Sequence, residues 1–264
     1  MNLEHLTRSP KNRTHQTPIL LQHGAWHGAW CWENWLAYFA EMGYEVHAFS
    51  LPAHGGSDPV RAHINLHTLG DYVGALGQIV ETIHPRPVVI GHSMGGGILQ
   101  KYLENHSLPG AVLLASIPSA GIFGFLLRQM TRYPDLIPAL LLWNTYAFVK
   151  TPQRVKEQFF GPENTMDPVA FHQKVQIESF LIATQTLLPF VNPAKVLKSQ
   201  TPILALAGEE DAVFTVPEEQ TMAARYGVPL KVFKRQGHNL MVEPLWREVA
   251  DTVDDWITNT LRLP

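Results

Sequence analysis

Short apolar runs alternate with amphipathic segments along most of the chain, and this alternation predicts the fold class. The apolar runs have the length of buried strands and lie at residues 18–23, 44–51, 87–90, 111–117, 203–207 and 230–233, the first of them being the first expected ordered element. Helical patterns cover the segment that ends near 42, then 66–83, 95–105, 218–226 and 246–261. Strands that alternate with helices predict a mostly parallel central sheet flanked by helices on both faces.

Residues 119–192 interrupt this alternation. The segment is rich in Leu, Phe and Trp, shows no convincing strand and is divided by several prolines, so it is expected to form several helices. We therefore predict an α/β core made of residues 1–118 and 193–264, with a helical cap, or lid, inserted late in the chain at 119–192. The apolar stripes of this cap are expected to pack mainly onto the core, and part of them to line a space above it.

Composition excludes several classes of protein. The 264 residues carry a net charge of −3 and are 45% hydrophobic, which fits a globular chain and gives no basic face for nucleic acid. A single cysteine, Cys31, excludes an intrachain disulfide. The first seventeen residues are too polar for a signal peptide, and the uncharged stretch 105–127 is broken by prolines and polar residues. We expect a cytoplasmic protein with no stable membrane insertion and no nucleic-acid partner.

The clearest chemical motif is Gly91-His92-Ser93-Met94-Gly95, which matches G-x-S-x-G. A predicted strand precedes it and a predicted helix follows it, which is the context of a nucleophile on a sharp strand-to-helix turn. Small residues at both ends allow this strained turn, and the turn exposes the serine hydroxyl to the first N–H groups of the helix. Ser93 is therefore the candidate nucleophile.

A serine nucleophile needs a base and a group that holds the base. Of the thirteen histidines, His238 is the best candidate for the base because it directly follows a late strand, whereas His92 is too close to Ser93 in sequence to reach its hydroxyl. His54 lies in a turn and has no clear role. The acid is expected among residues 209–211, which follow another late strand, and Asp58 and Asp71 are poorer candidates because of their early positions.

The order Ser, Asp, His and the motifs HGAWHGAW, LPAHGGSD, GHSMGG, GEEDAVF and GHNLMVE together resemble the α/β-hydrolase superfamily over nearly the whole chain. The resemblance implies that Asp211 is the acid, with Glu210 as the fallback. It also implies an oxyanion hole formed by the backbone N–H groups of Met94 and Ala25, with Trp26 as an alternative donor. His23 and Gly24 would set the conformation of this loop. We expect Trp26 and Met94 to contribute to the pocket wall, with Trp30 as a further candidate, although Trp30, Trp32 and Trp35 are expected mainly in the core.

The loop HGAWHGAWCW also resembles that of plant methylesterases and hydroxynitrile lyases. The lyases carry a threonine at the position of Gly24 and a lysine at that of Asn239, and both are absent here, so the esterase branch is favoured. Haloalkane dehalogenases have an aspartate where Ser93 stands, which excludes that chemistry.

The sequence thus predicts a serine hydrolase of the carboxylesterase or lipase type that acts through an acyl-enzyme, with no cofactor and no metal. The apolar cap favours a small-molecule substrate that is a neutral, mainly apolar ester, such as a fatty-acyl glyceride or lysophospholipid. Carbon–carbon bond hydrolysis and perhydrolysis on the same three residues remain alternatives, as does a receptor that binds a ligand without turnover. Acyl length, alcohol and oligomeric state stay open.

Overall fold

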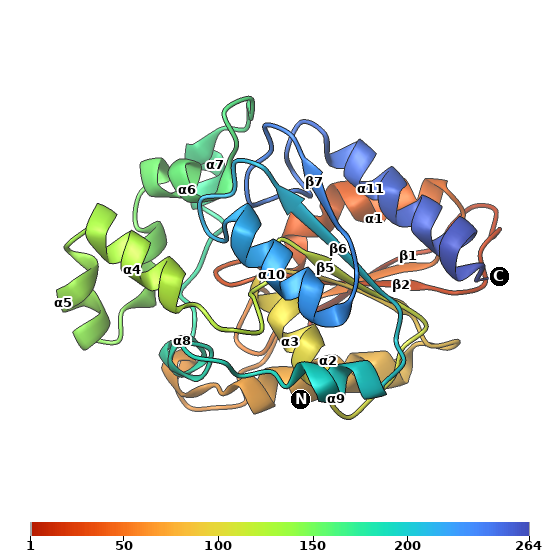
Figure 1. The fold of residues 1–264 in the computed structure, drawn as a ribbon, viewed down its shortest axis with the longest axis horizontal. Helices are drawn as coiled ribbons and strands as arrows, with labels where there is room; N and C mark the ends of the chain where they lie inside the picture. Colours follow the sequence, from red (N-terminus) through yellow and green to blue (C-terminus); the bar gives the residue numbers. More distant parts are fainter. Residues whose placement is uncertain (1, 264) are drawn as a thin grey trace.

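A seven-stranded sheet forms the centre of the computed structural model, which describes residues 2–263 (Figure 1). The strands are β1 (His5–Arg8), β2 (Ile19–Gln22), β3 (Val46–Phe49), β4 (Val88–His92), β5 (Ala111–Leu114), β6 (Ile203–Gly208) and β7 (Leu230–Phe233). Their order is β1-β3-β2-β4-β5-β6-β7, with β1 antiparallel to β3 and every other neighbouring pair parallel. The mostly parallel sheet predicted from the alternating pattern is confirmed.

Helices cover both faces of the sheet, and the alternation of side chains along each strand supplies a core to each face. On β2, Leu20 packs into one apolar cluster while Ile19 and Leu21 pack into the other. The first cluster is shared with α2 (Leu69–Thr82), α3 (Met94–Tyr102), α9 (Pro193–Lys198) and α10 (Val216–Tyr226). The second is shared with α1 (Glu33–Glu41) and α11 (Trp246–Asp255), which continues as a π-helical segment over Trp256–Leu261. The two helical layers lie on opposite sides of the strands in Figure 1.

The first ordered element is β1, so the prediction that order begins at residue 18 is wrong. The four residues of β1 are all exposed and show no apolar run, which is why the hydrophobic pattern gave no strand there. This strand is held by main-chain pairing to β3, with His5 opposite Phe49 and Arg8 opposite Val46. An edge strand needs only one partner and no buried face.

Between β5 and β6 the chain forms helices and no strand within the described residues. They are α4 (Phe123–Arg132), α5 (Leu136–Leu141), the 3-10 helix Thr145–Val149, α6 (Pro152–Phe159), α7 (Pro168–His172), α8 (Phe180–Gln185) and α9 (Pro193–Lys198). Figure 1 shows α4 to α7 gathered to one side of the sheet. Among residues 2–263, no helix has both the length and the apolar character needed to cross a membrane.

Candidate active site

Ser93 lies at the tip of the turn between β4 and α3. Its φ of 53° and ψ of −119° are strained for a residue with a side chain. The turn is held by the Ser93 N–H, which donates to the carbonyl oxygen of Leu114 on β5 at 3.0 Å. A Cβ atom at Gly91 would lie 2.6 Å from the carbonyl oxygen of Gly95, so only glycine fits where the strand and helix meet. The backbone thus places the Ser93 side chain at the carboxyl end of the sheet.

Asp211 and His238 come together from the loops after β6 and β7. The Nδ1–H of His238 donates to Oδ2 of Asp211 at 2.8 Å, and both side chains are almost completely buried. The other carboxylate oxygen, Oδ1, accepts from the N–H groups of Val213 and Phe214 at 2.7 and 3.0 Å. Three donors therefore fix the carboxylate, while the neighbouring Glu210 is exposed to solvent.

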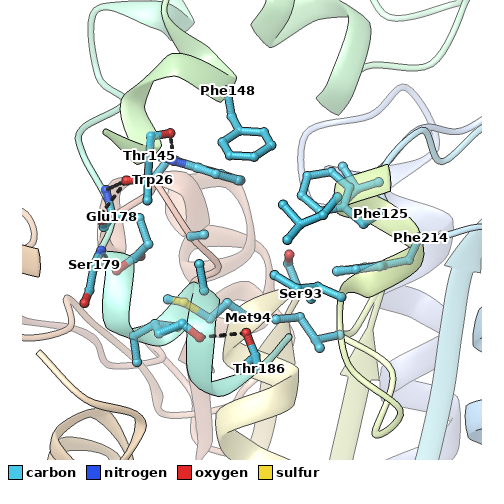
Figure 2. Close-up of a pocket in the computed structure, with 17 residues that line it drawn as sticks. Trp26, Ser93, Met94, Phe125, Thr145, Phe148, Glu178, Ser179, Thr186 and Phe214 are labelled. Carbon is cyan, nitrogen blue, oxygen red and sulfur yellow. Dashed lines mark hydrogen bonds between the residues drawn. The ribbon is translucent and has the colours of Figure 1, made fainter. Parts of the chain in front are cut away.

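His238 lies beside the strand end that carries Ser93. Its ring centroid is 4.8 Å from that of His92, whose Nε2–H donates to the His238 carbonyl oxygen at 3.1 Å. Phe214 packs edge-on against the His238 ring at 5.7 Å and lines the same pocket as Ser93. Within residues 2–263, no hydrogen bond joins the Ser93 hydroxyl to the imidazole, and Figure 2 shows the hydroxyl directed into the pocket. Catalytic hydrogen bonds often form only when substrate binds.

The loop from His23 to His27 reaches the other side of the serine. A Cβ atom at Gly24 would lie 2.7 Å from the Cβ atom of Ser93, so this loop approaches the serine closely only because it has glycine here. The Nδ1–H of His23 donates to the Gly24 carbonyl oxygen at 2.8 Å, while its Nε2 accepts from the Leu51 N–H at 2.9 Å. Burial holds the pKa of His23 well below its usual value of 6.5, so the ring is neutral as this pattern requires.

His23 orients the peptide unit that contains the Ala25 N–H, because the Gly24 carbonyl belongs to the same planar group. The next residue, Trp26, has a φ of 65°, in the left-handed region. Two contacts from the segment between β5 and β6 hold it there. The Trp26 carbonyl accepts from the Gln176 N–H at 3.0 Å, and its indole Nε1–H donates to the Thr145 carbonyl at 3.2 Å.

A pocket opens above Ser93, between the loops at the carboxyl end of the sheet and the helices that follow β5 (Figure 2). Ala25, Trp26 and Met94 are among the residues that line it. Most of the remaining wall is apolar and includes Ile117, Phe125, Phe148, Ile182, Val213 and Phe214. Such a wall favours an apolar ligand with few polar contacts.

Glu178 is the one ionisable side chain among the described residues that line this pocket, and it is paired. Its Oε2 lies 3.1 Å from Nε2 of His54, and its Oε1 accepts from the Tyr72 hydroxyl at 2.9 Å. Burial alone would lower the pKa of His54, but the Glu178 carboxylate more than offsets it and the pKa is raised. Sequence reasoning left His54 without a role, because its partner lies 124 residues away.

No group of three or more His, Cys, Asp or Glu side chains within residues 2–263 is arranged to hold a metal ion.

Comparison with known proteins identifies the family. The model of the alpha/beta hydrolase family matches residues 19–252. The pyrethroid hydrolase of Sphingobium wenxiniae is 26% identical over 90% of this chain and 88% of its own length. The monoacylglycerol lipase of Mycolicibacterium smegmatis is 26% identical over 92% and 88%. Norfluorocurarine synthase 2 from Strychnos is 37% identical, but over only 32% of each chain.

Among solved structures, an esterase of Exiguobacterium antarcticum matches 97% of this chain and 95% of its own with a TM-score of 0.73, at 21% identity. That likeness supports the fold, and the family model covers most of the sequence. The chain therefore belongs to the alpha/beta hydrolase family, where its relatives include esterases and lipases.

Proposed function

We propose that this protein is a serine carboxylesterase in which Ser93, His238 and Asp211 form the catalytic triad. The observation that carries the proposal is the 2.8 Å hydrogen bond between Asp211 and His238. It fixes the ring of His238 with the proton on Nδ1, so that Nε2 is free to accept the proton of a serine hydroxyl. The strained turn at Ser93, beside the same ring, supplies that hydroxyl.

In the proposed reaction, Ser93 Oγ attacks the ester carbonyl while His238 Nε2 takes the hydroxyl proton. The tetrahedral intermediate collapses, the imidazolium protonates the leaving alcohol, and an acyl-enzyme forms on Ser93. Water then attacks the acyl group with His238 as base, and the carboxylic acid is released. Asp211 keeps the imidazole in the required tautomer and stabilises its cationic form.

The proposed oxyanion hole consists of the N–H groups of Ala25 and Met94. The Met94 N–H is at the start of α3, where N–H groups lack helical partners and carry partial positive charge. The Ala25 N–H belongs to the peptide unit that His23 orients. Both residues line the pocket with Ser93, and a preorganised donor of this kind is worth about 3 kcal/mol of transition-state stabilisation.

The proposed substrate is a neutral, mainly apolar ester. Glu178 already has His54 as its counter-ion, so a charged group of an ester would be buried against the apolar wall without a counter-ion. The inserted segment 119–192 acts as a cap that supplies this wall, through residues such as Phe125, Phe148 and Ile182. The esterase and lipase relatives agree with this substrate class.

A series of p-nitrophenyl esters tests the proposal, with Ser93→Ala compared with the wild type and with Ser107→Ala, an exposed serine outside the pocket. We expect hydrolysis of uncharged acyl esters by the wild type and the control, and loss of about 10³-fold or more for Ser93→Ala. A fluorophosphonate should label Ser93 alone by intact mass and peptide mapping. Equal rates for Ser93→Ala and the wild type would refute the nucleophile, and best turnover on short charged esters would refute the substrate class.

A further inference from the structure

His27 is a buried histidine at the end of the loop from His23 to His27, which we call the oxyanion loop, and it faces the loop that carries His238; nothing above gives it a role. It is 1% exposed. Its Nδ1 lies 2.6 Å from the carbonyl oxygen of Ala25, and its Nε2 lies 3.1 Å from Nδ2 of Asn239. Ala25 belongs to the proposed oxyanion loop, and Asn239 directly follows His238.

The two contacts define one protonation state of the ring. A carbonyl oxygen only accepts, so the proton is on Nδ1, and the amide nitrogen of Asn239 only donates, so Nε2 is an unprotonated acceptor. The ring is therefore neutral, which agrees with a pKa that burial lowers to about 4. The other amide atom, Asn239 Oδ1, is buried and has no partner in the described part of the chain. The amide is thus oriented by its bond to His27.

One end of this bridge holds a peptide unit of the proposed oxyanion loop, and the other end is the side chain of Asn239, the residue that follows His238. The Ala25 carbonyl shares its peptide plane with the Trp26 N–H, just as the Gly24 carbonyl held by His23 shares its plane with the Ala25 N–H. His23 and His27 therefore each hold one of two consecutive peptide units of the oxyanion loop, through a hydrogen bond to its carbonyl oxygen. At the other end, the backbone N–H of Asn239 donates to the Phe159 carbonyl at 3.0 Å, which fixes the chain just after His238.

Water cannot replace this bridge, because aromatic side chains enclose the ring. Phe159, Trp30 and Phe171 lie at centroid distances of 5.1, 5.4 and 5.6 Å from His27. A buried polar group that loses its partner in such surroundings stays unsatisfied. His27 is not among the residues that line the pocket, so it does not contact a substrate there.

We propose that His27 is a positioning residue that couples the oxyanion loop to the loop of His238 through its hydrogen bonds to Ala25 and Asn239. The inference rests on the proposed function, since it assigns a role to these loops in ester hydrolysis. Base and oxyanion donors must act on one carbonyl group at the same time, and errors of about 1 Å in such an arrangement cost up to about 100-fold in rate. A direct link between the two loops keeps their spacing fixed.

Three variants of the bridge test the coupling. Asn239→Leu removes the donor, and His27→Phe removes both bonds while retaining a ring. In His27→Asn the side-chain amide nitrogen takes the place of Nδ1 and keeps the Ala25 bond but does not reach Asn239. His106→Phe, at an exposed histidine, is the matched control. Thermal unfolding of each variant identifies any that fail to fold.

We expect kcat to fall about 10- to 100-fold in His27→Phe, with KM within about threefold of the wild type, and a smaller fall in His27→Asn. The double variant His27→Phe/Asn239→Leu should be no slower than the slower single variant, because both changes break the same bridge. Folded single variants with wild-type kcat would overturn the proposal, as would losses that multiply in the double variant.

A measurement that needs no activity separates this inference from the proposed function. Histidine ¹⁵N NMR of the wild type at pH 7 should show His27 as the neutral Nδ1–H tautomer, and Asn239→Leu should shift its Nε2 resonance. An Nε2–H tautomer, or no shift in the variant, would overturn the bridge even if the protein hydrolyses esters. Failure of Ser93→Ala to lose activity would instead refute the triad and leave the bridge itself intact.

Discussion

Replacing Asp211 by Asn changes one atom of the proposed triad and keeps the local fold. Oδ1 accepts from two backbone N–H groups, so the asparagine oxygen must take that position and its NH₂ must face His238. An NH₂ group only donates, so Nδ1 of His238 loses its proton and Nε2 gains one. The ring then presents an N–H to Ser93 and cannot accept the hydroxyl proton.

We expect kcat to fall by about 10⁴-fold, equivalent to about 5.5 kcal/mol of transition-state stabilisation. The free energy of unfolding should fall by only about 1–2 kcal/mol, because a charge-assisted hydrogen bond becomes a neutral contact and the two backbone bonds remain. Steady-state hydrolysis of a mid-chain p-nitrophenyl ester and urea unfolding measure the two quantities.

Glu210→Gln is the control for this variant, because it removes the neighbouring carboxylate from an exposed position. It should leave kcat within about twofold, as is usual for a surface change away from the chemistry. If Asp211→Asn keeps more than about a tenth of wild-type kcat, Asp211 does not orient the base. If Glu210→Gln loses activity instead, the acid has been assigned to the wrong residue.

Three further predictions concern other parts of the structure. Trp26→Phe removes the donor to the Thr145 carbonyl, so urea unfolding should show a loss of about 1–3 kcal/mol and kcat should fall; an unchanged kcat would mean that this bond does not hold the oxyanion loop. Among the described residues, neither carboxylate oxygen of the buried Glu219 has a hydrogen-bond partner. Burial and, to a lesser extent, nearby carboxylates raise the pKa of Glu219 well above 4.5. Because the pKa is raised in the folded state, the free energy of unfolding of the wild type falls as pH rises above the usual glutamate range. Urea unfolding should therefore show Glu219→Gln to be more stable than the wild type at pH 8, with the difference in stability closing toward pH 4. A difference that does not depend on pH would contradict this. Gly91→Ala should prevent stable folding because its Cβ would lie 2.6 Å from a backbone oxygen of α3. Gly74→Ala, in open space on α2, should instead raise the free energy of unfolding by about 0.5–1 kcal/mol. Equal shifts of the thermal unfolding temperature for the two variants would refute the steric argument.

In the segment between β5 and β6, the sequence pattern predicts the helices but not the long-range contacts of their side chains. Leucine- and phenylalanine-rich stretches divided by prolines predict helices there, and the structure has them. The pairing of Glu178 with His54 has no signal in the sequence, because each residue type is common in exposed turns and they lie 124 positions apart. The same holds for His27, whose two partners come from different loops.

Alternating apolar runs and helical periods predicted the parallel sheet, because burial of a strand or helix requires a pattern of apolar residues within that short stretch of sequence. The G-x-S-x-G motif could be recognised for the same reason, because Gly91 is required by contacts with the backbone only four or five residues further along the chain. The tertiary structure alone decided the pairing of the exposed β1 with β3 and the partners of the buried histidines His27 and His54. These contacts depend on which loops come together once the sheet has formed. The residues next to each partner along the chain carry no signal of that long-range contact.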